Sequence, residues 1–340
     1  MSSPQSAMLD QQSSDQIRSR PCPNCFLCGA EGELLYERLK DRLFGAPGIW
    51  NFKRCPNPEC GLLWLDPMPV EEDIARAYES YYTHIDSLPD GSKRSKRKFL
   101  TRISNSVYGF CLRVTSVQRE RKRLASMYLA DVPPGRALDV GCGDGSRLAR
   151  LRTLGWDVQG QEMDPKAVSR ARQVYGVRIH LGPLEQAGFV DGEFDAIVMN
   201  HVIEHVHDSV RLLAQCNRLL RKGGTFIAVT PNAESHGLKC FGSSWRGLEP
   251  PRHLHIFSQR TLRDVAGRAG FSRFETWTTA ANADMLASGS VDIRAGGKKP
   301  SDFGPKLMRG LLILQYQLWW RLAHLKDRNS GEECVLKAAN

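Results

Sequence analysis

The chain has 340 residues, of which 41% are hydrophobic and 25% are charged, a composition typical of a globular protein with one main core and smaller additions. Residues 1–20 are polar and contain no apolar stretch after a basic start, which excludes a secretory signal there and predicts a disordered tail on a cytoplasmic protein. The net charge of +10 is local, because residues 93–123 hold eleven Lys or Arg and one acid, Glu120. Such a segment attracts nucleic acid, anionic lipid or a phosphorylated compound, or it forms a solvated helix face.

The N-terminal part of the chain contains two similar cysteine pairs, and each pair ends in Cys-Gly. Cys25 and Cys28 form the first pair, Cys55 and Cys60 form the second, and 26 residues separate the pairs. Four thiolates arranged in this way are typical ligands of a structural zinc ion, and the Gly permits the tight turn. The pairs therefore predict a zinc ribbon, with Cys22 as an alternative ligand in the first pair. The other interpretation is a small hairpin with free cysteines.

The following segment has helical periodicity. Residues 70–82 predict one amphipathic helix, and residues 96–129 predict one or two basic helices. The sequence DVPPG at residues 131–135 then interrupts the pattern.

From residue 136 onward, predicted strands and helices alternate. The strands are expected at residues 136–140, 157–161, 177–180, 194–199 and 225–230, and the helices from about residue 146 and at residues 165–175, 208–220 and 258–269. This alternation predicts a parallel sheet with helices on both faces. Ligands of such sheets bind at the carboxyl ends of the strands.

The loop after the first of these strands combines three glycines with two acids. Gly141, Gly143 and Gly145 let the backbone turn sharply and approach a ligand closely, but the third glycine comes one residue too early for a dinucleotide fingerprint. The carboxylates of Asp139 and Asp144 would repel a pyrophosphate and attract an ammonium or sulfonium cation. S-adenosylmethionine carries both of these cations and no phosphate.

A second acid supports the same ligand. Glu162 ends the next predicted strand, 23 residues after Asp139, where a carboxylate can accept both ribose hydroxyls. Together these motifs resemble those of class I S-adenosylmethionine-dependent methyltransferases, over about residues 136–274. The motifs are LDVGCGDG at 138–145, Glu162, FDAIVMNHVIEH at 194–205 and LLRKGGT at 219–225.

The resemblance implies an α/β, Rossmann-like, seven-stranded methyltransferase sheet. Its last two strands would form an antiparallel hairpin, for which residues 273–279 and 333–338 are the candidates. The implied cofactor-binding residues are Asp139, Gly141 and Gly143 for the methionine moiety, Glu162 for the ribose, Pro183 and Leu184 for the adenine, and Asn200 at the mouth of the site. Many relatives have an acid near the adenine, whereas this chain has Gly182-Pro-Leu-Glu185. We therefore expect backbone groups to replace that contact.

Polar residues after the fourth predicted strand are the candidates for chemistry on the methyl acceptor. Asn200, His201, Glu204 and His205 follow that strand, and the two histidines share one face if the turn is helical. In one interpretation His201 or His205 is the general base that deprotonates an acceptor hydroxyl. In a second, His201, Glu204, His205 and His253 bind a divalent ion, because the motif resembles the E-x-x-E-H of ubiquinone-pathway O-methyltransferases and small-RNA 2′-O-methyltransferases. In a third, Glu204 and His205 only cap and orient the helix.

Two further segments are long additions to the core. The loop after Thr230 runs to Phe257 and predicts an acceptor lid. An insertion over residues 281–330 contains leucines and tryptophans at helical spacing, and this pattern fits core or dimer packing, or contact with a membrane surface. It is too short to span a bilayer, because few apolar residues separate Arg309 from Arg321.

These features predict six regions and a function. The regions are a tail at 1–20, a zinc-ribbon-like segment at 21–66, a basic helical cap at 67–130, the methyltransferase core at 131–280, a helical insertion at 281–330 and the last strand of the sheet at 331–340. The whole layout resembles bacterial methyltransferases of secondary metabolism and surface-polysaccharide synthesis. This implies S-adenosylmethionine and zinc as cofactors and methyl transfer to a small or lipid-linked acceptor, at an oxygen of a sugar, envelope or secondary-metabolite precursor. The basic segment 93–123 and the helix 307–325 are the candidates for peripheral membrane contact or a homodimer interface.

Three alternatives to this function stay open. A zinc-ribbon C-methyltransferase of sugars would use His201 or His205 to remove a proton from carbon. An RNA methyltransferase would explain the ribbon and the basic segment, but Asn200-His-Val-Ile lacks the Asn/Asp-Pro-Pro-aromatic motif of enzymes that methylate exocyclic base amines. A non-catalytic cofactor-binding scaffold would bind the same nucleoside without turnover.

Overall fold

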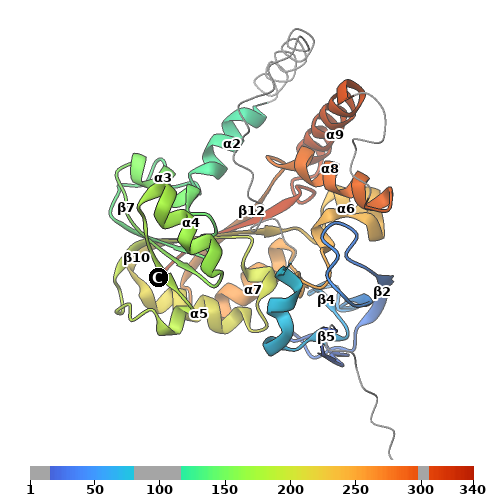
Figure 1. The fold of residues 1–340 in the computed structure, drawn as a ribbon, viewed down its shortest axis with the longest axis horizontal. Helices are drawn as coiled ribbons and strands as arrows, with labels where there is room; N and C mark the ends of the chain where they lie inside the picture. Colours follow the sequence, from blue (N-terminus) through green and yellow to red (C-terminus); the bar gives the residue numbers. More distant parts are fainter. Residues whose placement is uncertain (1–15, 80–115, 298–305) are drawn as a thin grey trace, which may run out of the picture.

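A seven-stranded sheet forms the centre of the chain (Figure 1). The computed structural model describes residues 16–79, 116–297 and 306–340. The strands lie in the order β12-β13-β10-β9-β6-β7-β8, and β13 runs antiparallel to both of its neighbours while the other neighbouring strands are parallel. Their bounds are β6 (Arg136–Val140), β7 (Asp157–Glu162), β8 (Arg178–Leu181), β9 (Phe194–Asn200), β10 (Leu220–Pro231), β12 (Arg273–Thr279) and β13 (Glu333–Ala339). This confirms the Rossmann-like sheet and the hairpin of its last two strands.

Two apolar cores lie on opposite faces of the sheet, because successive side chains of a strand point to opposite sides. Leu138 and Ile197 belong to the core that contains residues of α5 (Ser209–Leu219) and α7 (Gln259–Arg268). Ala137 and Val198 belong to the core that contains residues of α3 (Ser146–Thr153) and α4 (Pro165–Tyr175). The sheet is thus covered on both faces, as the alternation of strands and helices predicted.

Local signals in the sequence set the ends of these helices. The side chain of Asp164 accepts a hydrogen bond from the amide of Lys166 at the start of α4, and Gly176 ends that helix in a left-handed conformation. Ser258 and Thr261 form a capping box at the start of α7. Both helices therefore begin where the sequence predicted them.

The cysteine-rich segment forms a small sheet in which one strand comes from the core. Its order is β11-β4-β3-β2, with β2 (Glu33–Leu39), β3 (Trp50–Arg54), β4 (Leu63–Leu65) and β11 (His255–Ile256). We call residues 21–66 the N-terminal module. Its strand β4 pairs antiparallel with β11, which lies in the segment that was predicted to be an acceptor lid. That prediction is wrong for the end of the loop, because its apolar side chains are fully buried; they are Trp245, Leu248, Leu254, Ile256 and Phe257.

The end of the predicted tail is also packed. Ser19 and Arg20 form β1, which pairs with β5 (Met68–Pro69), and Ile17 is buried. Arg18 donates two side-chain hydrogen bonds to Asp73, at 2.8 and 3.0 Å. Residues 16–20 therefore belong to the folded unit, whereas the rest of the predicted tail lies outside the described residues.

The predicted helices between the module and the core are described only in part. Residues 71–78 form a 3-10 helix, η1 (Glu71–Tyr78), and residues 117–125 form α2 (Val117–Ala125). No side chain caps the start of η1, and its buried Asp73 bonds Arg18 instead. Seven of the eleven basic residues of segment 93–123 lie outside the described residues.

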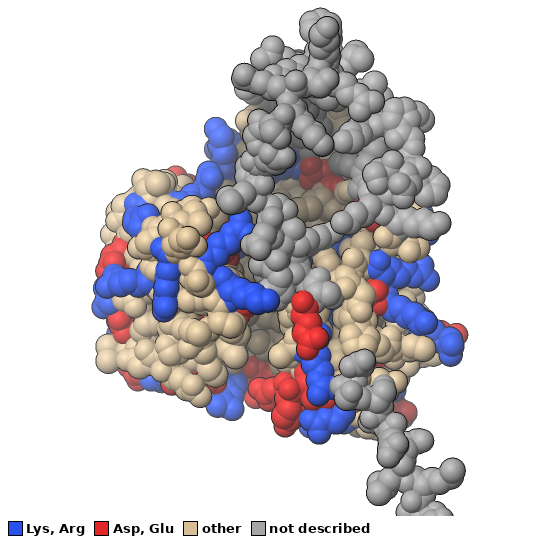
Figure 2. Space-filling view, viewed as in Figure 1, with Lys and Arg blue, Asp and Glu red and all other residues tan. Residues whose placement is uncertain are grey.

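The insertion forms α8 (Ala283–Arg294) and α9 (Lys306–Lys326), which lie beside the short helix α6 (His236–Phe241) in Figure 1. Arg121 of α2 pairs with Asp284 at 2.6 Å, and Glu120 pairs with Arg321 at 2.9 Å. These contacts favour the interpretation in which the insertion packs against the basic helical segment. In the described parts of the chain, no helix is long and apolar enough to cross a membrane. Figure 2 shows Lys and Arg scattered among acids over the described part of this face.

Candidate functional site

The glycine loop between β6 and α3 leads directly into the site. The backbone of Gly141 has a left-handed φ of 65°, and a Cβ atom at this position would collide with the side chain of Val202. Gly143 is also left-handed, with a φ of 53°, but apart from its chain neighbours no described residue comes within 4 Å of a Cβ atom built there. Gly141 is therefore required for packing against the turn after β9, while Gly143 leaves one side of the loop open.

Glu162, at the end of β7, is joined to this loop. Its Oε2 accepts a hydrogen bond of 2.7 Å from the amide of Gly143, and its Oε1 accepts from the amides of Met163 and Asp164 at 2.7 and 3.0 Å. The two motifs that the sequence assigned to the methionine moiety and the ribose thus meet at the carboxyl edge of the sheet.

Asp139 lies beneath the loop and is fully buried. Burial raises the pKa of its carboxyl group, and Arg147 opposes this by donating hydrogen bonds of 2.9 and 3.1 Å to the two oxygens. Arg147 on α3 was not among the predicted site residues. Its pairing with Asp139 leaves Glu162 and Asp144 as the acids at the rim of the loop.

The predicted adenine contacts follow β8. Leu184 is buried in the 3-10 helix η3 (Leu184–Gln186), and Pro183 precedes it. Gln161 links this turn to the glycine loop, because its Nε2 donates to the carbonyl of Gly182 at 2.7 Å and its Oε1 accepts from the amide of Gly141 at 3.3 Å. Sequence reasoning did not select Gln161, because its strand DVQGQE is mostly polar and nothing local distinguishes this glutamine.

Asn200 and His201 stand where β9 ends, beside the glycine loop. Asn200 is half-buried, and His201 has a left-handed φ of 54°. The helical turn after them is short, since η4 (Ile203–His205) is a 3-10 helix of three residues. His201 and His205 therefore do not share a helix face, and their rings have different partners.

His201 lies between two buried carboxylates. Its Nδ1 is 3.0 Å from Oε1 of Glu204, and its Nε2 is 2.8 Å from Oε1 of Glu333. Burial alone would lower the pKa of His201, but the hydrogen bonds with Glu204 and Glu333 outweigh burial and raise it to about 10. At neutral pH His201 is an imidazolium ion with both N–H groups engaged, so it is poorly suited to accept a proton.

Glu204 is the charged partner in this pair. Burial favours its neutral form, but the bonds with His201 lower its pKa to about 2, and Thr230 donates a further hydrogen bond of 2.9 Å. Glu333 comes from the first residue of β13, and Asn282 donates to both of its oxygens. Sequence reasoning missed Glu333, because nothing local marks a strand acid as the partner of a histidine 132 residues away.

The ring of His205 is held by a backbone carbonyl and by a tyrosine hydroxyl, whereas two carboxylates hold the ring of His201. Its Nδ1 lies 2.9 Å from the carbonyl oxygen of Arg252 and 3.0 Å from the hydroxyl of Tyr78. A carbonyl oxygen can only accept, so Nδ1 carries the proton and Nε2 has the lone pair. Burial lowers the pKa of His205, which keeps the ring neutral. Of the two candidate bases, His205 therefore has the suitable charge state.

His253 packs against His205, with the ring centroids 4.7 Å apart. Its Nδ1 donates to the carbonyl of Gly247 at 2.7 Å, and burial lowers the pKa of its ring well below the usual range. The ligand atoms of Glu204, His205 and His253 all lie within 4.8 Å of one another, so these three could hold a metal ion. The predicted fourth ligand, His201, is engaged by its two carboxylates.

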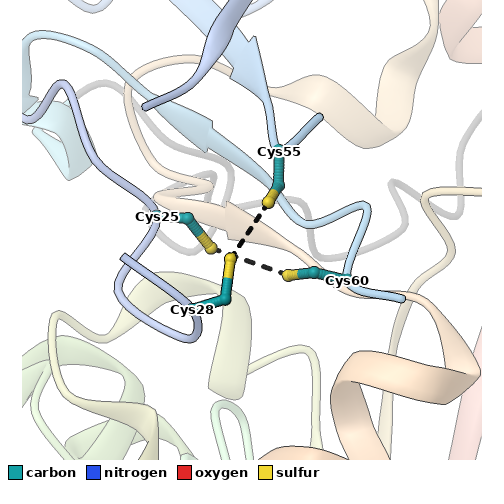
Figure 3. A group of neighbouring side chains, drawn as sticks. All are labelled: Cys25, Cys28, Cys55 and Cys60. Atoms are coloured by element: carbon teal, nitrogen blue, oxygen red, sulfur yellow. Dashed lines mark hydrogen bonds between the residues drawn. The ribbon is translucent and has the colours of Figure 1, made fainter. Parts of the chain in front are cut away.

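The second cluster of this kind is in the N-terminal module, where the four predicted cysteines converge (Figure 3). The Sγ atoms of Cys25 and Cys60 are 3.6 Å apart, and those of Cys28 and Cys55 are 3.3 Å apart. Sulfur atoms on a tetrahedral zinc ion, each about 2.3 Å from the metal, are separated by similar distances. Cys22 is not part of the cluster. Donor type, number and spacing therefore fit zinc.

Comparison with known proteins agrees with this geometry. Residues 113–275 match the family described as "Methyltransferase domain". The chain is 34% identical over 161 residues to a probable S-adenosylmethionine-dependent methyltransferase of Mycolicibacterium smegmatis, covering 47% of this chain and 60% of that protein. It is 30% identical over 146 residues to a ubiquinone biosynthesis O-methyltransferase of Cereibacter sphaeroides, covering 40% and 59%. The chain thus spans at most about 60% of the length of these two relatives.

Proposed function

We propose that this chain, whose residues 113–275 match the methyltransferase domain family, transfers a methyl group from S-adenosylmethionine to an acceptor. The observation that carries the proposal is the hydrogen bond of 2.7 Å from the amide of Gly143 to Glu162, beside the open side of the glycine loop. A carboxylate at this edge suits ribose hydroxyls and a cationic methionine group, and it disfavours a pyrophosphate.

The bound cofactor would supply a methyl group on a positively charged sulfur, which is an activated leaving group. The residues that would hold it are Glu162 for the ribose, the glycine loop for the methionine group, and Pro183 and Leu184 beside the adenine. Since the methyl donor is already activated, the protein mainly supplies proximity and orientation.

We propose an oxygen acceptor on a small or lipid-linked molecule. The O-methyltransferase relatives support this choice, and so does the neutral His205. In such a transfer the bond from the methyl carbon to the acceptor oxygen would form as its bond to sulfur broke, which would release S-adenosylhomocysteine. The hydroxyl proton would pass to Nε2 of His205, which makes His205 the proposed general base.

A metal ion on Glu204, His205 and His253 is the competing role for the same residues. The lone pairs on Nε2 of the two histidines favour it, because Nδ1–H of each ring is bound to a carbonyl, as in many metal sites. The carboxylate of Glu204 disfavours it, because its oxygens already bond His201 and Thr230. We therefore assign the base role to His205.

The cysteine cluster is proposed to bind one structural zinc ion. Each pair is followed by a left-handed glycine, at Gly29 and Gly61, and the turns are closed by hydrogen bonds such as that from the amide of Gly29 to the carbonyl of Cys25 at 2.8 Å. Such turns place two sulfurs on one side of the chain.

The experiment is to incubate the purified chain with an extract of its source cells and S-adenosylmethionine labelled in the methyl group, and to identify the labelled compound. We expect a small or lipid-extractable product. His205→Gln should reduce labelling by about 100-fold or more, as is usual for loss of a general base. Glu275→Gln, an exposed acid on β12, is the matched control and should label normally.

Other results would change the proposal. Label in RNA or protein would contradict the acceptor class, and the absence of any labelled compound despite cofactor binding would favour a scaffold. Labelling that stops with EDTA and returns with a divalent ion would replace the base role of His205 with the metal role.

A further inference from the structure

Arg252 is a completely buried charged side chain that joins the N-terminal module to the core. Its side chain has no exposed surface, and its three nitrogens bond three separate groups. Nη2 donates to Asp41 of the module at 2.7 Å, Nη1 donates to the carbonyl of Ala77 in η1 at 2.7 Å, and Nε donates to Glu249 at 2.9 Å. The guanidinium also lies over the ring of Phe44, 4.8 Å from its centroid.

The partner in the module is itself fixed. The carboxylate of Asp41 accepts hydrogen bonds from the amides of Leu43, Phe44 and Ala46, at 3.0 to 3.1 Å. The loop between β2 and β3 therefore presents a buried carboxylate with a fixed orientation to Arg252. This loop joins two strands of the N-terminal module, which also contains the cysteine cluster.

Both partners of Nδ1 of His205 come from the segments that Arg252 ties together. One partner is the carbonyl of Arg252 itself, at 2.9 Å. The other is the hydroxyl of Tyr78, at 3.0 Å, and Tyr78 follows the residue whose carbonyl Arg252 holds. In addition, the amide of Leu254 donates to the carbonyl of Glu204 at 2.8 Å, which fixes the turn that carries His205.

We infer that Arg252 is a positioning residue, through which Asp41 of the N-terminal module fixes the tautomer and orientation of His205. The inference rests on the proposed role of His205 as a base. If the carbonyl of Arg252 moved, the Tyr78 hydroxyl would be left as the partner of Nδ1, and a hydroxyl can donate as well as accept. The proton could then shift to Nε2, the atom that must take the proton of the methyl acceptor. The module is then part of the catalytic apparatus and more than an appended ribbon.

The charged and titratable groups that face His205 are Glu204 and His201 on its own segment, Tyr78 on η1, and Arg252 and His253 on the loop before β11. Burial is the main cause that lowers the pKa of His205; the charge of Glu204 and the hydrogen bond to the carbonyl of Arg252 raise it, and the positive charges of His201 and Arg252 lower it. Replacing Arg252 would therefore act on the pKa of His205 in two opposing directions, because it removes a positive charge and frees the carbonyl. The tautomer of His205 is therefore the quantity to measure.

The test is an NMR titration of the full chain labelled with ¹⁵N in its histidines, in which the signals of His205 are identified by their loss in His205→Gln. In the unchanged chain we expect one tautomer, with the proton on Nδ1, and a pKa below the ordinary value. In Arg252→Met, which keeps the aliphatic stem, we expect both tautomers.

Arg246→Met is the matched control, because Arg246 pairs with the same Glu249 and lies over the same Phe44 ring. It should leave the tautomer of His205 unchanged. If Arg252→Met does not fold, Asp41→Asn replaces it, since it removes the charge of one partner and keeps the shape, and the second tautomer is again expected. A single Nδ1–H tautomer in a folded variant would overturn the inference.

The test of Arg252 and the test of the proposed function can fail independently of each other. Arg252→Met should bind S-adenosylmethionine as tightly as the unchanged chain, because it does not touch the glycine loop or Glu162. Failure of the unchanged chain to bind that nucleoside would contradict the proposed function, whereas the tautomer measurement needs no cofactor or acceptor.

Discussion

Two histidines four residues apart differ in charge at neutral pH: one is a cation and the other is neutral. His201 is held as a cation by Glu204 and Glu333, whereas His205 is kept neutral by burial. The sequence predicted that this turn carries the chemistry but could not choose between the histidines. The choice depends on Glu333 and Tyr78, which lie 132 and 127 residues away in the chain. In contrast, Glu162 was predictable, because its distance from Asp139 reflects a local strand and helix.

The charge state of His201 predicts a loss of stability at high pH. Its pKa is raised from 6.5 to about 10, so its contribution to the free energy of unfolding is complete below about pH 6.5 and is lost as the pH rises toward 10. His201→Asn should remove this part of the pH dependence. Urea denaturation between pH 6 and pH 10 measures it, and an identical slope for both proteins would contradict the assignment.

At the scale of secondary structure, the segment that ends in β11 shows why the prediction of a lid was wrong for the end of this loop. Its length and its place after a strand are typical of a functional loop. The sequence of the loop alone did not show that His255 and Ile256 would pair with Trp64 and Leu63, nearly 200 residues earlier. Long-range pairing of short strands leaves little local signal, while the capped helices α4 and α7 were predicted close to their observed ends.

The cysteine cluster supports a prediction at this scale. The purified chain should contain about one zinc ion, and Cys55→Ser should abolish zinc binding and expose β3, β4 and β11 to hydrogen exchange, because the ion holds both turns of the module. Cys22→Ser is the control, since Cys22 lies outside the cluster. Metal analysis and exchange mass spectrometry provide the measurement. Zinc content that falls in Cys22→Ser and not in Cys55→Ser would contradict the ligand set.

At the scale of the whole molecule, the parallel sheet with helices on both faces followed from the alternation of elements, and its antiparallel hairpin followed from the resemblance, whereas the joining of the parts did not. The insertion illustrates the difference. Its helical pattern was evident, but which face of α9 is buried depends on α6 and α2. In the structure Trp320 is buried and lies near Phe241 and Tyr316, while the neighbouring Trp319 is 63% exposed.

These two tryptophans form a matched pair for a stability test. Trp320→Ala should lower the free energy of unfolding by about 3–5 kcal/mol, because it removes a large buried ring and leaves a cavity. Trp319→Ala should change it by about 0.5 kcal/mol or less. Urea denaturation of both variants gives the comparison. Equal effects would contradict the observed packing of α9 on the core.

Isothermal titration calorimetry of the full chain is the most direct test of which nucleoside binds the glycine loop. We expect binding of S-adenosylmethionine and S-adenosylhomocysteine and no binding of NADH. Glu162→Gln should weaken binding by roughly 10- to 150-fold, the effect of losing a charged hydrogen bond, while Glu275→Gln should not. A chain that binds NADH and ignores both sulfur nucleosides would contradict the account.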